Sequence, residues 1–499
     1  MRATPASLPN LEIAAYFLIW TGGVFYSTYH VYIISNSFAN QMDADMLEPG
    51  WRIISRRKDV SDYEWRMWLP FLWELAPWFL LHLSVSETLR WCNAKILLRL
   101  WYILVTSTFS LYFCGWVSLV AMILAPLILF SISQIRKPIL CWAASISLLL
   151  GLSIFPIPMV SEKQQMAFYV SFAWIQLRCL SFCLDWIHCR PWMKSADSGS
   201  FLLRLLSYTF YLPLMFLGPF VSFQQFEKSM ETLSFSLNDL KFRALRLILN
   251  SFRFLGWMVV TEFCLHFIYC NAIQMHHEIL PFLDAWTLNG LAYCIGQFFL
   301  NKYVVVYGLM GTLAEFDTIC APPVPRCIAH ISMYSDMWRH FDRGFYNFIR
   351  SYIYDPLVQK YSERSRHILL STVCFAFVYV WHGLSTNILI WSVCNFGGVL
   401  LETLGGGLTR SETYQQFEEK LSVQNVRRWR ALTASPLFIL SALTMFFFLG
   451  GMEVGTVFVL QIVQGSLLRN TALLFFAYCM CQVSLEIKLI KERRKPKQP

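Results

Sequence analysis

Two ionisable residues stand out because each lies in or beside a strongly apolar stretch. Asp342 lies within "MWRHFDRGFYNFIRSYIYDPL" (Met337–Leu357), and His382 ends the apolar run "FAFVYVW" and precedes a glycine. Ionisable groups at membrane depth are costly and usually face the interior of a helix bundle, so function is the first hypothesis for both. A neutral imidazole is a suitable base for the proton of an attacking nucleophile.

Each of these residues also has a structural interpretation. His382 can be a core histidine whose ring is satisfied by a backbone carbonyl. Asp342 can form an ion pair with Arg339, three residues before it, at the membrane surface. The arginines of this stretch can extend to phospholipid headgroups, or they can hold the phosphates of a nucleotide-like donor such as coenzyme A. The sequence leaves these alternatives open.

The stretch around Asp342 is long enough for one helix. On a helical wheel its aromatic residues share one stripe and its arginines another, with Asp342 on the border. We expect Asp355, directly before a proline, to mark the end of this helix. The aromatic stripe consists of Trp338, Phe341, Phe345, Phe348 and Tyr352, and the basic stripe of Arg339, Arg343 and Arg350.

The elements that position these residues must be membrane helices. The chain has 499 residues, of which 56% are hydrophobic and only 14% are charged, whereas soluble domains carry about 25% charged residues. We expect an all-α polytopic bundle with ten to twelve membrane-embedded segments, including re-entrant elements. The candidate segments are residues 11–35, 68–89, 96–113, 116–135, 138–159, 167–187, 201–223, 244–270, 286–316, 368–380, 387–401, 436–450 and 455–490, the last broken into two elements.

Other kinds of site have weaker support. The chain contains no GxSxG elbow and no P-loop, so it supports neither a serine hydrolase nor a nucleotide-driven pump. Most of its 15 cysteines lie in apolar runs, where a thiol acts as a small hydrophobic group. Cys179, Cys183, His188 and Cys189 suggest zinc, but without a second CxxC a packed or lipidated thiol cluster is the better interpretation.

Several motifs together resemble a known family. The run "PPVPRCIAHISMYSDMWRHFDRGFYNFIRSYIYDPL" is followed, 40 residues after Asp342, by the histidine of "FAFVYVWHG". Supporting pieces are "LRCLSF" (Leu177–Phe182), "LGPFVSFQQF" (Leu217–Phe226) and "FLGGMEVG" (Phe448–Gly455). With this pattern the chain resembles the membrane-bound O-acyltransferase family. The likeness covers most of the chain and is densest over residues 322–402.

The resemblance implies roles for particular residues. His382 would be the catalytic histidine and Asp342 its essential acidic companion. Cys327 would be the thiolate ligand of a structural haem b iron. Trp338 would lie beside the acyl chain, and polar residues of the same stretch would contact the acyl-CoA. The residues assigned to substrate and acyl-CoA binding are Trp338, Arg339, Asn347 and Arg350.

The implied reaction transfers palmitate from palmitoyl-CoA to the N-terminal cysteine amine of a secreted signalling protein of the Hedgehog type, in a tunnel across the membrane. The whole chain, residues 1–499, would form one domain, with a catalytic core at 201–455 and a basic cytosolic tail at 488–499. We expect the protein in the endoplasmic reticulum membrane, with the Golgi as the alternative, among membrane lipids and without nucleic acid. Competing interpretations are O-acylation of a lipid or sterol hydroxyl, and a non-catalytic relative.

Overall fold

The computed structural model describes residues 7–43, 45–157, 159, 161–188, 198–231, 236–327, 333–360 and 366–493. Helices dominate these residues, and one small antiparallel pair of strands, β1 (Leu47–Pro49) and β2 (Arg57–Asp59), follows the first helix. The helices are α1 (Asn10–Phe38), α2 (Tyr63–Trp91), α3 (Lys95–Cys114), α4 (Trp116–Ser133), α5 (Pro138–Ile154), α6 (Glu162–Ile187), α7 (Ser198–Thr209), α8 (Leu212–Met215), α9 (Phe223–Glu231), α10 (Leu237–Cys264), α11 (Cys270–Met275), α12 (Ala285–Phe316), α13 (Tyr334–His340), α14 (Arg343–Ile349), α15 (Asp355–Lys360), α16 (Arg366–Trp381), α17 (Thr386–Leu408), α18 (Glu412–Glu419), α19 (Val423–Val463) and α20 (Leu467–Arg493).

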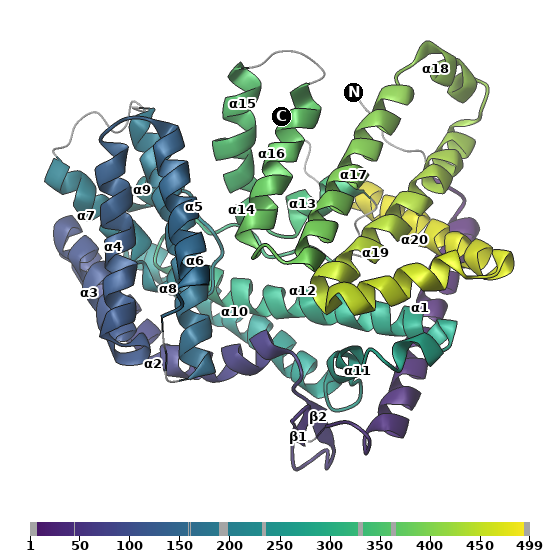
Figure 1. Cartoon of the computed structure of the whole chain (residues 1–499), viewed down its shortest axis with the longest axis horizontal. Coiled ribbons are helices and arrows are strands. Elements are labelled where there is room, and N and C mark those ends of the chain that lie inside the picture. The colour runs from purple at the N-terminus through teal and green to yellow at the C-terminus, as the bar shows by residue number, and fades with distance from the viewer. Residues whose placement is uncertain are drawn as a thin grey trace.

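The long helix α12 joins the two sides of the molecule. Helices α2 to α9 form one group, and α1 and α17 to α20 lie on the other side, with α12 running between them (Figure 1). α12 packs against α2 and α8 at one end of this arrangement and against α1, α11 and α19 at the other, while α10 lies along it. The short helices α13 and α14 lie near the middle, between the two groups (Figure 1).

The prediction of an all-α polytopic membrane protein is confirmed. Seven of the described helices are long and apolar enough to cross a membrane: α3, α4, α6, α10, α17, α19 and α20. Two shorter apolar helices, Pro138–Ile154 and Ile368–Trp381, add to them. α6 is the most enclosed of the seven, with 78% of its apolar window buried, whereas α10 has 17% of its window buried and faces outward.

Three of the predicted segments have a different form. Residues 201–223 do not form one span, because α7 ends at Thr209 and only the four-residue helix α8 precedes an irregular stretch. Pro213 and Pro219 in this stretch cannot donate a backbone hydrogen bond, which shortens its helices. The segment 436–450 and the first part of 455–490 both belong to α19, which is interrupted at Gly451, where φ is +78°. The predicted break within 455–490 is found between Val463, the end of α19, and Leu467, the start of α20. Glycine tolerates this left-handed conformation because it has no Cβ.

Buried polar side chains of α6 hold the irregular stretch after α7 in place. Arg178 has 1% of its surface exposed, and its guanidinium donates to the carbonyl oxygens of Tyr208 (3.4 Å) and Thr209 (3.2 Å) and also to that of Leu214. One turn later, the Ser181 hydroxyl accepts from the Phe223 N–H at 2.9 Å. Because backbone groups that leave a helix inside a bundle must find partners in the protein, these bonds make the irregular stretch possible.

We predict that Arg178→Leu destabilises the protein strongly. The variant leaves buried carbonyl oxygens without a donor, at a cost of about 3 kcal/mol in total. The thermal midpoint of the detergent-solubilised protein, followed by size-exclusion chromatography, should fall by several degrees. Arg410→Leu, at an exposed arginine after α17, is the matched control and should keep the original midpoint. Equal midpoints for the two variants would contradict the structural role of Arg178.

Candidate functional site

Asp342 lies at a break between two helices. α13 ends at His340 and α14 begins at Arg343, so the prediction of one continuous helix from Met337 is wrong. Asp342 itself is extended, with φ −112° and ψ 93°, and its Oδ1 accepts the Phe345 N–H at 2.8 Å. This is the N-cap bond for which aspartate is favoured, because it satisfies a free N–H of the first helical turn. The carboxylate therefore fixes the direction in which α14 leaves the break.

The helix continues past the expected end at Asp355. Residues Arg350–Tyr354 form a π-helical turn, and α15 begins directly at Asp355. Since a π turn inserts an extra residue into the helical repeat, a single wheel cannot describe the stretch. The side chains of Phe345, Phe348 and Tyr352 are nevertheless buried as the aromatic stripe predicts.

A second helix holds the other oxygen of Asp342. The hydroxyl of Tyr307, on α12, donates to Oδ2 at 2.9 Å. Within the described part of the chain, Arg339 forms no ion pair with Asp342, so the alternative of a surface i,i+3 pair is wrong. Asp342 instead joins α12 to the start of α14, through one hydroxyl and one backbone N–H.

His382 follows the last residue of α16 and is surrounded by rings. The backbone N–H of His382 donates to the Val378 carbonyl oxygen at 3.1 Å, and the chain turns at Gly383, where φ is +109°. The imidazole meets Phe345, Trp391 and Phe448 edge to face, at centroid distances of 6.1, 5.4 and 5.3 Å. Its ring nitrogens make no hydrogen bond to any residue that the structure describes, so the backbone-satisfied core histidine is not what is found. The nitrogens are left for a ligand.

His382 and Asp342 belong to one closed series of contacts, which we call the aromatic collar. The two are linked through Phe345, whose N–H binds Asp342 and whose ring faces His382. In order, the collar runs from His382 to Phe448 (5.3 Å), Phe299 (5.8 Å), Tyr303 (5.0 Å), Tyr307 (5.3 Å), Asp342 (2.9 Å), Phe345 (2.8 Å) and back to His382 (6.1 Å). The histidine and the aspartate thus both lie in the aromatic collar, without a hydrogen bond between them.

Trp338 lies next to this collar. Its ring packs against Trp391 at 5.5 Å, and Trp391 in turn contacts His382. Its Nε1 donates to the Oδ1 of the buried Asn395 at 3.3 Å, and the Asn395 amide donates to the Trp391 carbonyl at 2.8 Å. α17 therefore holds the orientation of Trp338 through one side-chain amide.

The polar residues that the sequence assigns to acyl-CoA lie elsewhere. Arg339, Asn347 and Arg350 are exposed, and none of them has a described contact with the collar. Arg350 forms only a loose ion pair with Asp355, at 3.5 Å. The structure brings together the histidine, the aspartate and the tryptophan, and it does not bring these three residues to them.

Cys327 provides at most one ligand of a cofactor. Its side chain is half-buried, at the end of a proline-rich segment whose continuation, residues 328–332, lies outside the described residues. The described residues contain no group of three His, Cys, Asp or Glu side chains that could hold a metal ion. One thiolate is still sufficient as the axial ligand of a haem, so the residue fits that single role.

The sequence did not indicate the helices that complete the site. Tyr307 is one of several aromatic residues on the 32-residue α12, and nothing in its spacing separates it from the core. Trp391, Asn395 and Phe448 likewise lie in apolar stretches. A buried asparagine in a membrane helix is the only signal of the three that stands out, because such a polar group needs a partner.

Comparison with known proteins gives a consistent set of similarities. The sequence model of the membrane-bound O-acyltransferase family matches residues 194–444, a range that includes Asp342 and His382. The mouse protein-cysteine N-palmitoyltransferase HHAT is 29% identical over 96% of this chain and 98% of its own length. The Drosophila melanogaster protein-cysteine N-palmitoyltransferase Rasp is 29% identical over 97% of this chain and 96% of its own length. The Schizosaccharomyces pombe membrane-bound O-acyltransferase gup1 is 29% identical over 39% of this chain and 32% of its own length.

We predict that Asp342→Ala and Asp342→Asn differ in stability. Asparagine is as good an N-cap as aspartate, whereas alanine loses the bond to the Phe345 N–H at a cost of about 1 kcal/mol. Thermal midpoints in detergent should therefore fall for the alanine variant and stay near the original for the asparagine variant. Asp355→Ala, which removes only an exposed ion pair, is the control and should change little. An equal fall for both Asp342 variants would exclude the capping role.

Proposed function

Because the chain belongs to the membrane-bound O-acyltransferase family, we propose that this acyltransferase palmitoylates the N-terminal cysteine of a secreted protein of the Hedgehog type. Palmitoyl-CoA is the acyl donor. The observation that carries the proposal is the extent of similarity: 96% and 97% of the chain for the two protein-cysteine N-palmitoyltransferases, against 39% for gup1. Similarity outside the family's common region favours the same acceptor class over a lipid hydroxyl.

The proposed reaction makes one amide and releases one thiol. A ring nitrogen of His382 accepts a proton from the α-amine of the acceptor cysteine as the amine nitrogen attacks the thioester carbonyl carbon. The carbon–sulfur bond then breaks, coenzyme A leaves as a thiolate, and this thiolate takes up the proton. The unbonded ring nitrogens support this role, because no described residue competes for them.

Asp342 acts as a positioning residue in this proposal. Its carboxylate is already used by the Tyr307 hydroxyl and the Phe345 N–H, so its function is to hold Phe345 against His382. The aromatic collar suits the palmitoyl chain, since each buried CH₂ contributes about 0.8 kcal/mol to binding. Trp338, beside the collar, is proposed to contact the acyl chain, while the exposed Arg339, Asn347 and Arg350 would attract the phosphates of coenzyme A from the surface.

The remaining features of the proposal concern the chain as a whole. We assign residues 1–499 to one domain, with the catalytic core at 201–455, and place it in the endoplasmic reticulum membrane. The basic segment 488–499 would face the cytosol, following the tendency of Lys and Arg to stay on that side. Residues 494–499 of this tail lie outside the described residues.

We predict that His382→Ala abolishes transfer while the protein stays folded. The assay combines purified protein, palmitoyl-CoA and a peptide that begins with cysteine, and identifies the product by mass spectrometry. The palmitoyl group should resist hydroxylamine, as an amide does and a thioester does not. His188→Ala, at an exposed histidine at the end of α6, should keep full activity.

Three further results of this assay would count against the proposal. A peptide with an acetylated amine should receive no stable palmitoyl group, and labelling equal to that of the free peptide would move the acceptor to the thiol. Acylation of lipid or sterol hydroxyls in place of the peptide would favour the O-acyltransferase alternative. Absence of any product with all of these acceptors would favour a non-catalytic relative.

We also propose haem b as a structural group with Cys327 as its thiolate ligand, following the family resemblance. A thiolate-bound haem supplies only a rigid anchor in this assignment, and no reaction step uses it. The purified protein should show the absorption band of a thiolate-ligated haem, and Cys327→Ala should remove it. Cys320→Ala, at the other end of the same proline-rich segment, is the matched control and should keep the band. A colourless protein from haem-supplemented cells would refute the assignment.

A further inference from the structure

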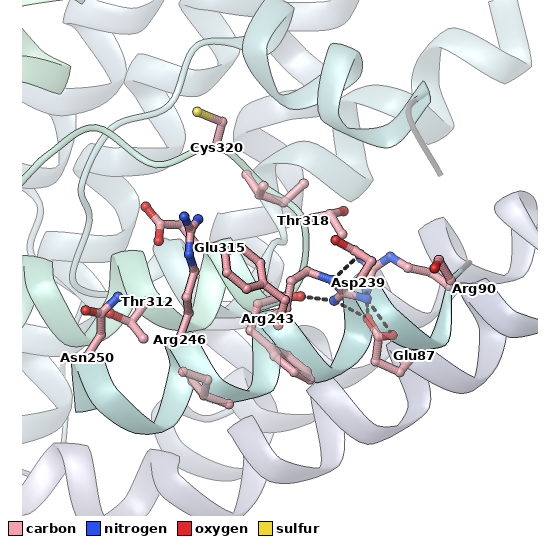
Figure 2. Close-up of a pocket in the computed structure, with 15 residues that line it drawn as sticks. Glu87, Arg90, Asp239, Arg243, Arg246, Asn250, Thr312, Glu315, Thr318 and Cys320 are labelled. Atoms are coloured by element: carbon pink, nitrogen blue, oxygen red, sulfur yellow. Dashed lines mark hydrogen bonds and ion pairs between the residues drawn. The ribbon is translucent and has the colours of Figure 1, made fainter. Parts of the chain in front are cut away.

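A second polar region lies away from the aromatic collar. A cavity of about 570 Å³ opens where the start of α10 meets the last turns of α2 and α12, and its lining continues to Cys320. Figure 2 shows that charged side chains from all three helices gather in it. None of its lining residues belongs to the collar, so the proposed acyl transfer does not account for it.

Most of the charges in the cavity neutralise each other. Arg243 donates to both oxygens of Glu87 (2.7 and 3.0 Å) and to Asp239 (2.8 Å), as the dashed lines in Figure 2 mark for the Glu87 contacts. Arg90 pairs with Glu87 at 3.0 Å and with the buried Asp317 at 2.5 Å. These five charged groups are thus ion-paired within the protein.

Two side chains of opposite charge remain. Arg246 of α10 and Glu315 of α12 both line the cavity and lie next to each other (Figure 2), yet neither forms an ion pair with any residue that the structure describes. The guanidinium of Arg246 lies over the Phe242 ring at 4.3 Å, which holds it at the cavity. Asn250 and Thr312 add neutral polar groups to the same lining. The cavity therefore offers one cation beside one anion, and no described ion pair binds either of them.

The helix that carries Arg246 has a largely exposed apolar surface. α10 is a membrane-spanning candidate with most of its apolar window exposed. Four of its six charged residues, Asp239, Lys241, Arg243 and Arg246, lie near its start, and the stretch that follows to Cys264 is mainly apolar, with Arg253 and Glu262 as its charged residues. This order places the cavity at headgroup depth, with the hydrocarbon region below it. Exposed apolar side chains that begin at the cavity and continue along the helix are Phe242, Leu245, Leu249 and Phe252.

We propose that this cavity binds the headgroup of phosphatidylethanolamine. The phosphate lies against Arg246 and the ammonium against Glu315, while the acyl chains follow the apolar face of α10. A zwitterionic headgroup matches the paired charges of the cavity, whereas an anion would leave Glu315 beside a like charge. An ethanolamine ammonium also has N–H donors for Glu315 and for the oxygens of Asn250 and Thr312, which a choline group lacks.

The bound headgroup would cover a reactive reporter. Cys320 is exposed and lines the cavity, and its N–H donates to the Ser229 hydroxyl at 3.3 Å, so its position is fixed. Cys92, at the end of α2, is also exposed but is not among the lining residues. Modification of Cys320 therefore reports on the cavity, and modification of Cys92 in the same protein reports on a surface outside it.

The experiment measures alkylation of both cysteines by a water-soluble maleimide, followed by peptide mass spectrometry. Delipidated protein in detergent is titrated with phosphatidylethanolamine. We expect the lipid to slow modification of Cys320 and to leave Cys92 unchanged. Arg246→Gln and Glu315→Gln should each require about tenfold more lipid for the same protection, the loss expected for one charge-assisted hydrogen bond. Arg253→Gln, at an exposed arginine further along α10, should behave as the unmodified protein.

Each other outcome contradicts the proposal. Equal protection by phosphatidylcholine would show that the N–H donors of the ammonium group do not contribute to binding. Stronger protection by phosphatidylserine would show that the cavity prefers an anionic lipid. Protection by glycerophosphoethanolamine at the same concentration would assign a soluble phosphodiester in place of a lipid. Protection that survives both substitutions, or no protection at all, would exclude the cavity as the site. Because no arm measures acyl transfer, the result is independent of the proposed enzyme activity.

Discussion

The bond between the Asp342 carboxylate and the Phe345 N–H is the interaction on which the geometry of the site depends. Asp342 is the extended residue that precedes α14, and this bond fixes the first turn of that helix. That turn carries Phe345, whose ring forms one wall around His382. The other carboxylate oxygen accepts the hydroxyl of Tyr307 on α12, so the same group connects the site to the helix that joins the two sides of the molecule. An aspartate that joined the histidine directly could not do both.

The irregular backbone around this site depends on a second set of buried polar groups. Arg178 and Ser181 of α6 supply donors and acceptors to the segment between α7 and α9. The same Ser181 hydroxyl bonds the Tyr352 hydroxyl at 2.8 Å, in the π-helical turn after α14. α6 thus holds both the segment between α7 and α9 and the π-helical turn that follows α14. In a bundle where water cannot satisfy exposed backbone groups, such side chains are a condition for any non-helical segment.

The class of fold could be predicted from the sequence, whereas the arrangement of the proposed site residues could not. Apolar composition and run length indicate a polytopic helix bundle, because the cost of burying charge applies to every span alike. Asp342 and His382 could be singled out because ionisable residues in or beside apolar stretches are unusual, and Trp338 because it belongs to the pattern that resembles the family. The break at Asp342 could not be predicted from a wheel that assumes one continuous repeat. Tyr307, Trp391 and Phe448 come from distant helices, and only tertiary packing brings them to His382.

The absence of a hydrogen-bonded partner for His382 among the described residues has a consequence for the proposed chemistry. A histidine that keeps a proton in apolar surroundings needs a buried counter-charge, and Asp342 is already used by two donors. The proposed reaction avoids this need, because the proton that leaves the amine ends on the sulfur of coenzyme A. The imidazole carries it only between two steps, and no net charge stays in the bundle. An amine acceptor and a thioester donor are therefore a pair for which a histidine without an acidic partner is sufficient.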